Sequence, residues 1–229
     1  APQGLLDTPQ LGYDETRAVI EEWHGKGRNH VAITPRFAIT STPEQMAMTQ
    51  KLAEEFPDLH IQTHLSENHD EIRYTCELYP DAKDYTDIYA RYGLLRKKAL
   101  FGHAIHLSDR EADAMAESGA VAVHCPTMDE AYKIQQLLGE RLNPLESFYH
   151  MTLGNAVALD LADRIGTLDE GTDADIVVLN AAATPAMRLR METVTSLGEE
   201  LFLLQTLGDD RSVVETYVAG KASKPDSLM

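Results

Sequence analysis

The chain has 229 residues, of which 43% are hydrophobic and 25% are charged, a composition that is typical of a globular protein and excludes a disordered chain. Its 37 acidic residues outnumber the 20 Lys and Arg residues, and the resulting net charge of −17 argues against nucleic acid and anionic membranes as partners. The two cysteines are isolated in the sequence and no apolar run has the length of a membrane span, so we expect a cytoplasmic protein.

Between residues 14 and 127, apolar strand-like runs alternate with helix-like segments. The first helix is expected around Ile20, and two later helices are expected to begin at capping boxes, one at Thr42 and one at Ser108. A further helix is expected from residue 67 to residue 78. The expected strands are residues 30–35, 59–64, 99–103 and 121–125. This repetition predicts an α/β protein with a parallel sheet built from βαβ units.

The alternation ends at Thr127. Two helical segments follow (128–142 and 144–160), and β-like runs (175–180 and 213–220) then flank a helix around residues 197–207. Four parallel strands would form only half of a barrel, and a complete (β/α)8 TIM-type barrel needs about 250 residues. We therefore predict that residues 1–162 are part of such a barrel, which lacks an N-terminal part and a segment between Thr127 and Met128. Residues 163–224 are predicted to form a small C-terminal β-sandwich region, and residues 224–229 a tail.

The strongest cluster of polar residues is THLSEN (63–68), at the end of the second expected strand. Side chains at the carboxyl ends of barrel strands surround the active site. A neutral imidazole at His64 suits zinc or iron, and Glu67 is close enough in sequence to reach a metal-bound water. In the alternative interpretation, His64 only ends a strand and Glu67 only begins a helix, where an acid favours the dipole.

His103 ends the neighbouring expected strand and should face the same cavity, where it could hydrogen-bond a hydroxide or a tetrahedral centre. We expect His106 to face solvent or to lie just behind the residues that contact the ligand, and His124, near the end of the fourth strand, is a weaker candidate for substrate contact. The other histidines are expected to be surface or packing residues: His24, His30, His60, His69 and His150.

Arg36 and Phe37 follow the first expected strand. A guanidinium supplies paired planar donors and an aromatic ring supplies a stacking face, which together suit a flat heterocycle that bears a carbonyl. In the alternative interpretation, Arg36 forms a salt bridge at the barrel rim and Phe37 packs in the core. The functional interpretation gains weight because three successive strand ends carry residues of this kind.

These motifs resemble those of the guanine deaminases in the metal-dependent amidohydrolase superfamily. The resemblance runs through ITPRFA (33–38), THLSEN (63–68), GHAIHLSD (102–109), HCPT (124–127), EAYK (130–133) and TLGDDRS (206–212). Residues 166–179, GTLDEGTDADIVVL, are similar to the segment with which an amidohydrolase chain returns to its small β-sandwich.

The resemblance implies hydrolytic deamination of guanine to xanthine and ammonia, with one zinc ion, or iron, per chain and a homodimeric enzyme. It implies that His64 is a metal ligand at the substrate site, that Glu67 is the proton shuttle, and that His103 lies beside the hydroxide and the substrate. Arg36 and Phe37 would contact the purine. The family's paired His-x-His ligands and its strand-end Asp ligand have no counterpart in this sequence.

Two alternatives stay open at this point. The first is a related amidohydrolase that deaminates or dechlorinates another amino-heterocycle, such as a pterin or a triazine. The second is a non-catalytic relative that keeps an inert half-barrel, because one convincing zinc ligand is fewer than the three or four that zinc needs.

Overall fold

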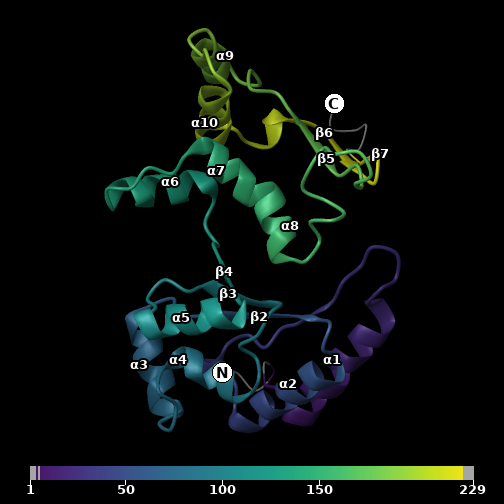
Figure 1. The fold of residues 1–229 in the computed structure, drawn as a ribbon, viewed down its shortest axis with the longest axis vertical. Helices are drawn as coiled ribbons and strands as arrows, with labels where there is room; N and C mark the ends of the chain where they lie inside the picture. The colour runs from purple at the N-terminus through teal and green to yellow at the C-terminus, as the bar shows by residue number, and fades with distance from the viewer. Residues whose placement is uncertain (1–3, 5, 224–229) are drawn as a thin grey trace. The chain divides into compact units, whose positions relative to one another are not determined.

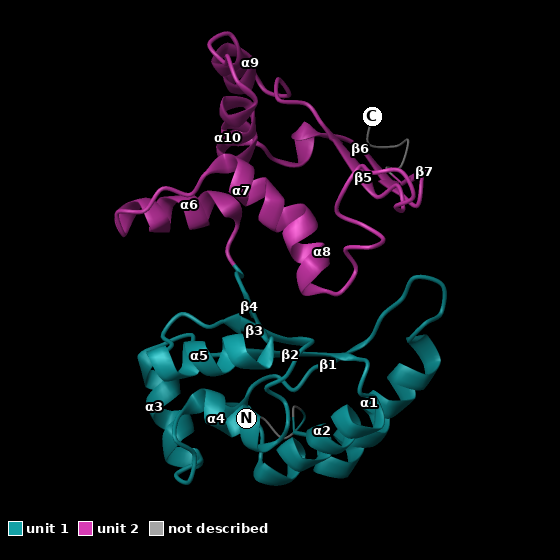
Figure 2. Cartoon of the chain, in the orientation of Figure 1, with its two compact units in different colours: residues 1–125 teal, residues 126–229 magenta. Residues whose placement is uncertain are grey.

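The computed structural model describes residue 4 and residues 6–223, and the chain divides into two compact units after Cys125 (Figure 1, Figure 2). The first unit holds a parallel sheet in the order β1-β2-β3-β4. Its strands are β1 (Ala32–Ile33), β2 (His60–Leu65), β3 (Ala99–His103) and β4 (Val121–Val123). Its helices are α1 (Pro9–Trp23), the 3-10 helix η2 (Ala38–Thr40), α2 (Pro43–Glu55), α3 (His69–Leu78), α4 (Tyr85–Arg91) and α5 (Asp109–Ser118). The predicted parallel α/β architecture is confirmed, with the four strands in an open sheet.

Side-chain capping sets where the helices of this unit begin. The Thr42 hydroxyl accepts the Gln45 amide at the start of α2, and the Gln45 side chain accepts the Thr42 amide in return. The predicted box at Ser108 is also present at α5. A further box joins Asn68 to Glu71 at α3, so this helix begins at His69, two residues later than expected. Each box satisfies backbone N–H groups that a helix start leaves unpaired.

The two faces of the parallel sheet have different environments. Along β2, Ile61, Thr63 and Leu65 are buried, whereas the intervening Gln62 is exposed and His64 is half-buried. Successive strand residues point to opposite faces, so the buried set packs against the helices. Figure 2 shows helices α1–α5 gathered on one side of the strands of the first unit. The helices therefore anchor one face of the sheet, and the other face carries the polar residues of β2.

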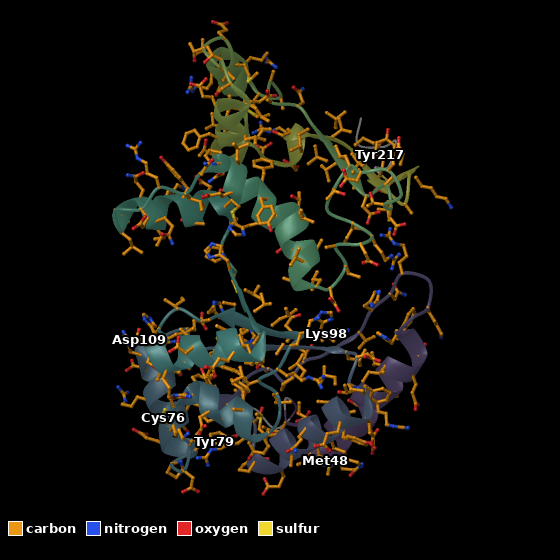
Figure 3. The ribbon with its side chains drawn as sticks, viewed as in Figure 1. Met48, Cys76, Tyr79, Lys98, Asp109 and Tyr217 are labelled. Carbon is orange, nitrogen blue, oxygen red and sulfur yellow. The ribbon has the colours of Figure 1, made fainter. Side chains whose placement is uncertain are left out.

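One buried carboxylate, that of Glu111, links α4 to α5 through hydrogen bonds. Glu111, only 6% exposed, accepts the Thr86 amide at 3.3 Å and the Thr86 hydroxyl at 3.2 Å with one oxygen. Its other oxygen accepts the Ser108 amide at 2.9 Å and the Ser108 hydroxyl at 2.8 Å. Helix α4 was not predicted, although it is marked in the sequence by the N-cap Asp84 and by Tyr85, Ile88 and Tyr89, which have the spacing of one helix face. Tyr79 and Cys76, labelled in Figure 3, come from the C-terminal end of the neighbouring α3.

The second unit contains helices and a separate antiparallel sheet in the order β5-β6-β7. The Met187 and Leu203 side chains form its buried core with Ala181. The Tyr132 ring packs edge-on against the Phe202 ring, with the ring centroids 5.0 Å apart. Its strands are β5 (Ile176–Leu179), β6 (Val213–Val218) and β7 (Lys221–Ala222). Its helices are α6 (Met128–Leu137), α7 (Pro144–Tyr149), the π-helix η3 (His150–Gly154), α8 (Asn155–Ala158), α9 (Pro185–Met191), α10 (Leu197–Leu207) and the 3-10 helix η4 (Asp210–Ser212). The expected C-terminal sheet is therefore present.

The compact units divide the chain earlier than the predicted domains do. Helices α6–α8 belong to the second unit, whereas the sequence analysis assigns residues up to 162 to the barrel. That domain assignment stays a prediction, and residues 224–229 lie outside the described residues. None of the helices in residues 6–223 combines the length and the apolar character needed to cross a membrane.

Replacing Glu111 by alanine should destabilise the first unit. The substitution leaves the Thr86 amide and hydroxyl buried without an acceptor, and each such group costs about 1–3 kcal/mol. We expect the free energy of unfolding to fall by about 2–4 kcal/mol, measured by urea denaturation followed by circular dichroism. The exposed Glu117 on the same helix provides the control. A loss for Glu111→Ala no larger than that for Glu117→Ala would contradict this role.

Candidate active site at the carboxyl ends of the strands

The parallel pairing of β2 with β3 places His64 beside Gly102. A side chain at position 102 would have its Cβ 3.3 Å from the Thr63 carbonyl oxygen and 3.6 Å from the His64 ring. The tighter of these contacts is with the Thr63 carbonyl, so the absence of a Cβ at Gly102 allows the two strand backbones to approach closely beside His64. The His64 and His103 rings are stacked with their centroids 5.4 Å apart. The two histidines predicted from successive strand ends therefore meet at one edge of the sheet.

A backbone carbonyl orients the His64 ring. His64 Nδ1 lies 2.6 Å from the carbonyl oxygen of Arg36. A carbonyl oxygen only accepts hydrogen bonds, so Nδ1 carries the proton and the lone pair is on Nε2. Metal-binding histidines are commonly fixed in this way, with one ring nitrogen bonded to a carbonyl and the other free to coordinate. The geometry thus suits His64 as a metal ligand.

Arg36 and Phe37 extend from the end of β1 toward the same edge. The Arg36 guanidinium carbon lies 5.4 Å from the centroid of the Phe37 ring, and that ring meets the His64 ring edge-on at 5.6 Å. Arg36 is exposed and forms no ion pair with a carboxylate in the described part of the chain, and Phe37 is half-buried outside the core cluster. The structure therefore does not support the alternative interpretation of a salt-bridged Arg36 and a Phe37 packed in the core.

Left-handed backbone conformations gather at this edge. Ser66 has a φ of 49°, His103 of 69° and Ala104 of 50°. Such values are strained for residues with a side chain and cluster at functional sites. Hydrogen bonds across the strand ends hold them: the Ala104 amide donates to the Leu65 carbonyl at 2.8 Å, and the Ile105 amide donates to the Ser66 carbonyl at 3.2 Å. The turn after β3 is thereby docked on the turn after β2.

Glu67 lies next to His103, and its carboxylate is accessible. Glu67 Oε2 lies 3.7 Å from His103 Nε2, and the Glu67 side chain is 49% exposed. The Glu67 amide donates to the Glu71 carboxylate at 3.1 Å, which anchors the backbone and leaves the Glu67 side chain available. A carboxylate and an imidazole at this separation can both hydrogen-bond one molecule bound beside them and exchange protons with it. The structure therefore brings together all five residues singled out by the sequence: Arg36, Phe37, His64, Glu67 and His103.

The described residues do not form a complete metal site. Residue 4 and residues 6–223 contain no group of three or more His, Cys, Asp or Glu side chains that could hold a metal ion. Zinc sites need three or four protein ligands. His64 is oriented as one ligand, and this agrees with the lack of a His-x-His pair and a strand-end Asp in the sequence.

Several contacts near the site were not predicted. His69 and His106 stack with ring centroids 4.0 Å apart, and this pairing was not expected. Burial lowers the pKa of His124, which follows β4. The Tyr89 hydroxyl, from the unpredicted α4, contacts both Thr63 and the backbone of His64. Burial raises the pKa of Tyr89 to about 12, so this hydroxyl keeps its proton at neutral pH.

Comparison with known proteins agrees with this fold. The model of the amidohydrolase family matches residues 7–136, and a second amidohydrolase family model matches residues 108–223. The first match covers more than half of the chain. The chain therefore belongs to the amidohydrolase family. The open parallel sheet is part of the TIM-type barrel architecture of this superfamily.

Within this family the similarity is to guanine deaminases. The chain is 42% identical over 260 residues to guanine deaminase of Escherichia coli (strain K12), covering 96% of this chain and 59% of that protein. The solved structure of the E. coli enzyme matches with a TM-score of 0.96 at 41% identity, over 98% of this chain and 62% of that one. A guanine deaminase structure from C. acetobutylicum with guanine in its active site matches with a TM-score of 0.82 at 25% identity, over 97% of this chain and 62% of that one. The chain thus spans about three-fifths of the length of these relatives.

Proposed function

We propose that the protein is a zinc-dependent guanine deaminase, which hydrolyses guanine to xanthine and ammonia. The observation that carries this proposal is the meeting of Arg36, Phe37, His64, Glu67 and His103 at one edge of a parallel sheet. The 42% identity to the E. coli guanine deaminase supports guanine over a pterin or a triazine as the substrate.

The metal part of the proposal concerns His64. Its Nδ1 is held by the Arg36 carbonyl, which supports Nε2 as the ligand atom. Zinc, when bound, lowers the pKa of water toward about 7 and so supplies a nucleophile at neutral pH. The remaining ligands would have to come from parts of the whole protein other than the described residues. Iron is the alternative metal.

The chain's own residues have separable tasks in the reaction. Arg36 would hold the carbonyl edge of the purine through paired donors, and Phe37 would pack on the face of the ring. Glu67 would accept one proton of the attacking water and deliver it to a ring nitrogen as the water oxygen bonds to C2. It would then take the remaining proton from that oxygen and pass it to the leaving amine, as the C2–O bond becomes a carbonyl and the C2–N bond breaks. His103 would donate a hydrogen bond to the oxygen at the tetrahedral C2. Water and guanine are consumed, and xanthine and ammonia are formed.

The alignment itself supports a segment missing from the interior of this chain. The alignment with the E. coli protein runs over 260 positions, whereas the whole chain has 229 residues, so the relative has residues inside the aligned span that this chain lacks. We infer that they fall between Thr127 and Met128, where the predicted alternation ends. Residues 1–162 as the barrel part, residues 163–224 as the C-terminal region, cytoplasmic location and a homodimer all stay predictions.

The direct test is an activity assay on the protein that carries these residues. Guanine, a pterin and an amino-substituted triazine are offered separately as substrates. We expect ammonia release with guanine, accompanied by the ultraviolet spectrum of xanthine. Metal analysis of the same preparation should find about one zinc or iron per chain. Turnover of another ring without guanine would overturn the substrate, and a metal-free protein without turnover would favour the inert relative.

Replacing Glu67 by glutamine should abolish most of the turnover and leave the metal content unchanged. The substitution removes a proton carrier without removing a ligand, and general acid-base groups contribute roughly 10²- to 10⁴-fold. Steady-state kcat and metal analysis measure the two effects. Glu77→Gln, on the exposed part of α3, is the control and should retain wild-type kcat. Retention of more than about a tenth of the wild-type rate in Glu67→Gln would reject the assigned role.

Replacing Arg36 by alanine should chiefly weaken guanine binding. Hydrogen bonds that involve a charged group contribute about 1.5–3 kcal/mol, so we expect KM to rise by about 10- to 100-fold. Arg36→Lys keeps the charge but loses the planar pair of donors, and it should show most of the same increase. An unchanged KM in Arg36→Ala would remove this residue from the substrate site.

A further inference from the structure

Tyr89 lies behind the site, where no solvent reaches it. It comes from α4, its side chain is fully buried, and its ring packs between those of Tyr85 and Phe101, with centroids 5.7 Å and 5.3 Å away. A phenol buried in an aromatic cluster needs partners for its hydroxyl group. The Tyr89 hydroxyl contacts both segments that carry the candidate site, the residues after β1 and the end of β2.

The Tyr89 hydroxyl has three polar neighbours. Its proton is donated to the His64 carbonyl oxygen at 2.7 Å. Its oxygen accepts the Ala38 amide at 3.0 Å and lies 3.2 Å from the Thr63 hydroxyl. The single Thr63 proton can be donated either to this oxygen or to the Arg36 carbonyl 3.3 Å away. A single buried atom thus joins the segment after β1 to the end of β2.

These contacts belong to a network of polar contacts around the Arg36 backbone, which we call the circuit. The Arg36 carbonyl accepts His64 Nδ1 at 2.6 Å and lies 3.3 Å from the Thr63 hydroxyl, which in turn contacts Tyr89. Ala38, which donates to Tyr89, directly follows Phe37. The circuit therefore fixes both the backbone that carries the Arg36 and Phe37 side chains and the backbone that carries the His64 ring.

We propose that Tyr89 is a positioning residue, whose hydroxyl sets the placement of the Arg36–Phe37 segment relative to His64. This inference rests on the proposed function. If Arg36 and Phe37 hold the purine while His64 marks the reacting centre, Tyr89 determines how well the bound ring meets that centre. An error of about 1 Å in such a placement can reduce a rate by 10²-fold.

The stacked neighbour Tyr85 offers a matched control. Tyr85 is equally buried and lies in the same helix, but its hydroxyl makes none of the contacts with Ala38, Thr63 and His64 that the Tyr89 hydroxyl makes. Tyr89→Phe and Tyr85→Phe therefore remove the same atom from adjacent buried rings, and only the first removes the contacts to the two segments of the site. Thr63→Val is an independent second variant, because it removes the other hydroxyl of the circuit and keeps the shape of the side chain.

The experiment measures kcat and KM for guanine, and hydrogen exchange at the Ala38 amide, in the protein that carries these residues. Tyr89→Phe should raise KM and lower kcat, each by about 10-fold, and speed exchange at Ala38 by at least about 10-fold. Tyr85→Phe should stay within about twofold of wild type in all three quantities. Thr63→Val should shift KM in the same direction as Tyr89→Phe, and it replaces that variant if the latter does not fold.

Three outcomes would overturn the proposal. The first is a Tyr89→Phe protein that matches Tyr85→Phe in KM and in Ala38 exchange. The second is a loss of kcat with KM and exchange unchanged, which indicates only a smaller folded fraction. The third, where Tyr89→Phe does not fold, is a Thr63→Val protein with the wild-type KM. If the proposed function itself is wrong, the wild-type protein will release no ammonia from guanine. Hydrogen exchange at Ala38 would still show whether its amide is bonded to the Tyr89 hydroxyl.

Discussion

The parallel pairing of β2 with β3 is the constraint on which the rest of the candidate site depends. Its register sets His64 beside Gly102, where the two strand backbones approach closely, and it brings His103 to the same edge. A shift by one residue would send His64 to the face that is packed against helices. The burial of Ile61 and Leu65 under those helices therefore determines the position of a polar side chain on the opposite face.

The residues of the site are held by different means. Backbone carbonyls and buried hydroxyls orient His64 and the Arg36 segment, whereas Glu67 is anchored through its own amide and keeps an accessible carboxylate. This division suits amidohydrolase chemistry, because a ligand and a substrate clamp must stay fixed while a proton carrier must move between atoms. In the proposed function, this chain would supply the substrate contacts and the proton carrier, together with one candidate metal ligand.

Much of this arrangement was predictable from local sequence. Capping boxes at Thr42 and Ser108 and the apolar strand runs are short-range signals, and neighbouring parallel strands end at the same edge, so the meeting of His64 with His103 followed. The backbone hydrogen bond from His64 to Arg36 was not predictable, because it joins segments 28 residues apart through a carbonyl that every residue carries. Tyr89 was missed for a related reason: a buried tyrosine has no sequence signature that separates a core residue from a polar anchor.

Ser66 shows that the site has a thermodynamic cost. This residue combines a left-handed backbone with a buried hydroxyl oxygen that has no hydrogen-bond partner in the described part of the chain, and glycine would remove both sources of instability. The same change would loosen the turn that presents Glu67. Directed evolution for heat resistance alone would therefore be drawn toward glycine at this position, whereas screening for turnover would retain serine, so the two goals compete at a single codon.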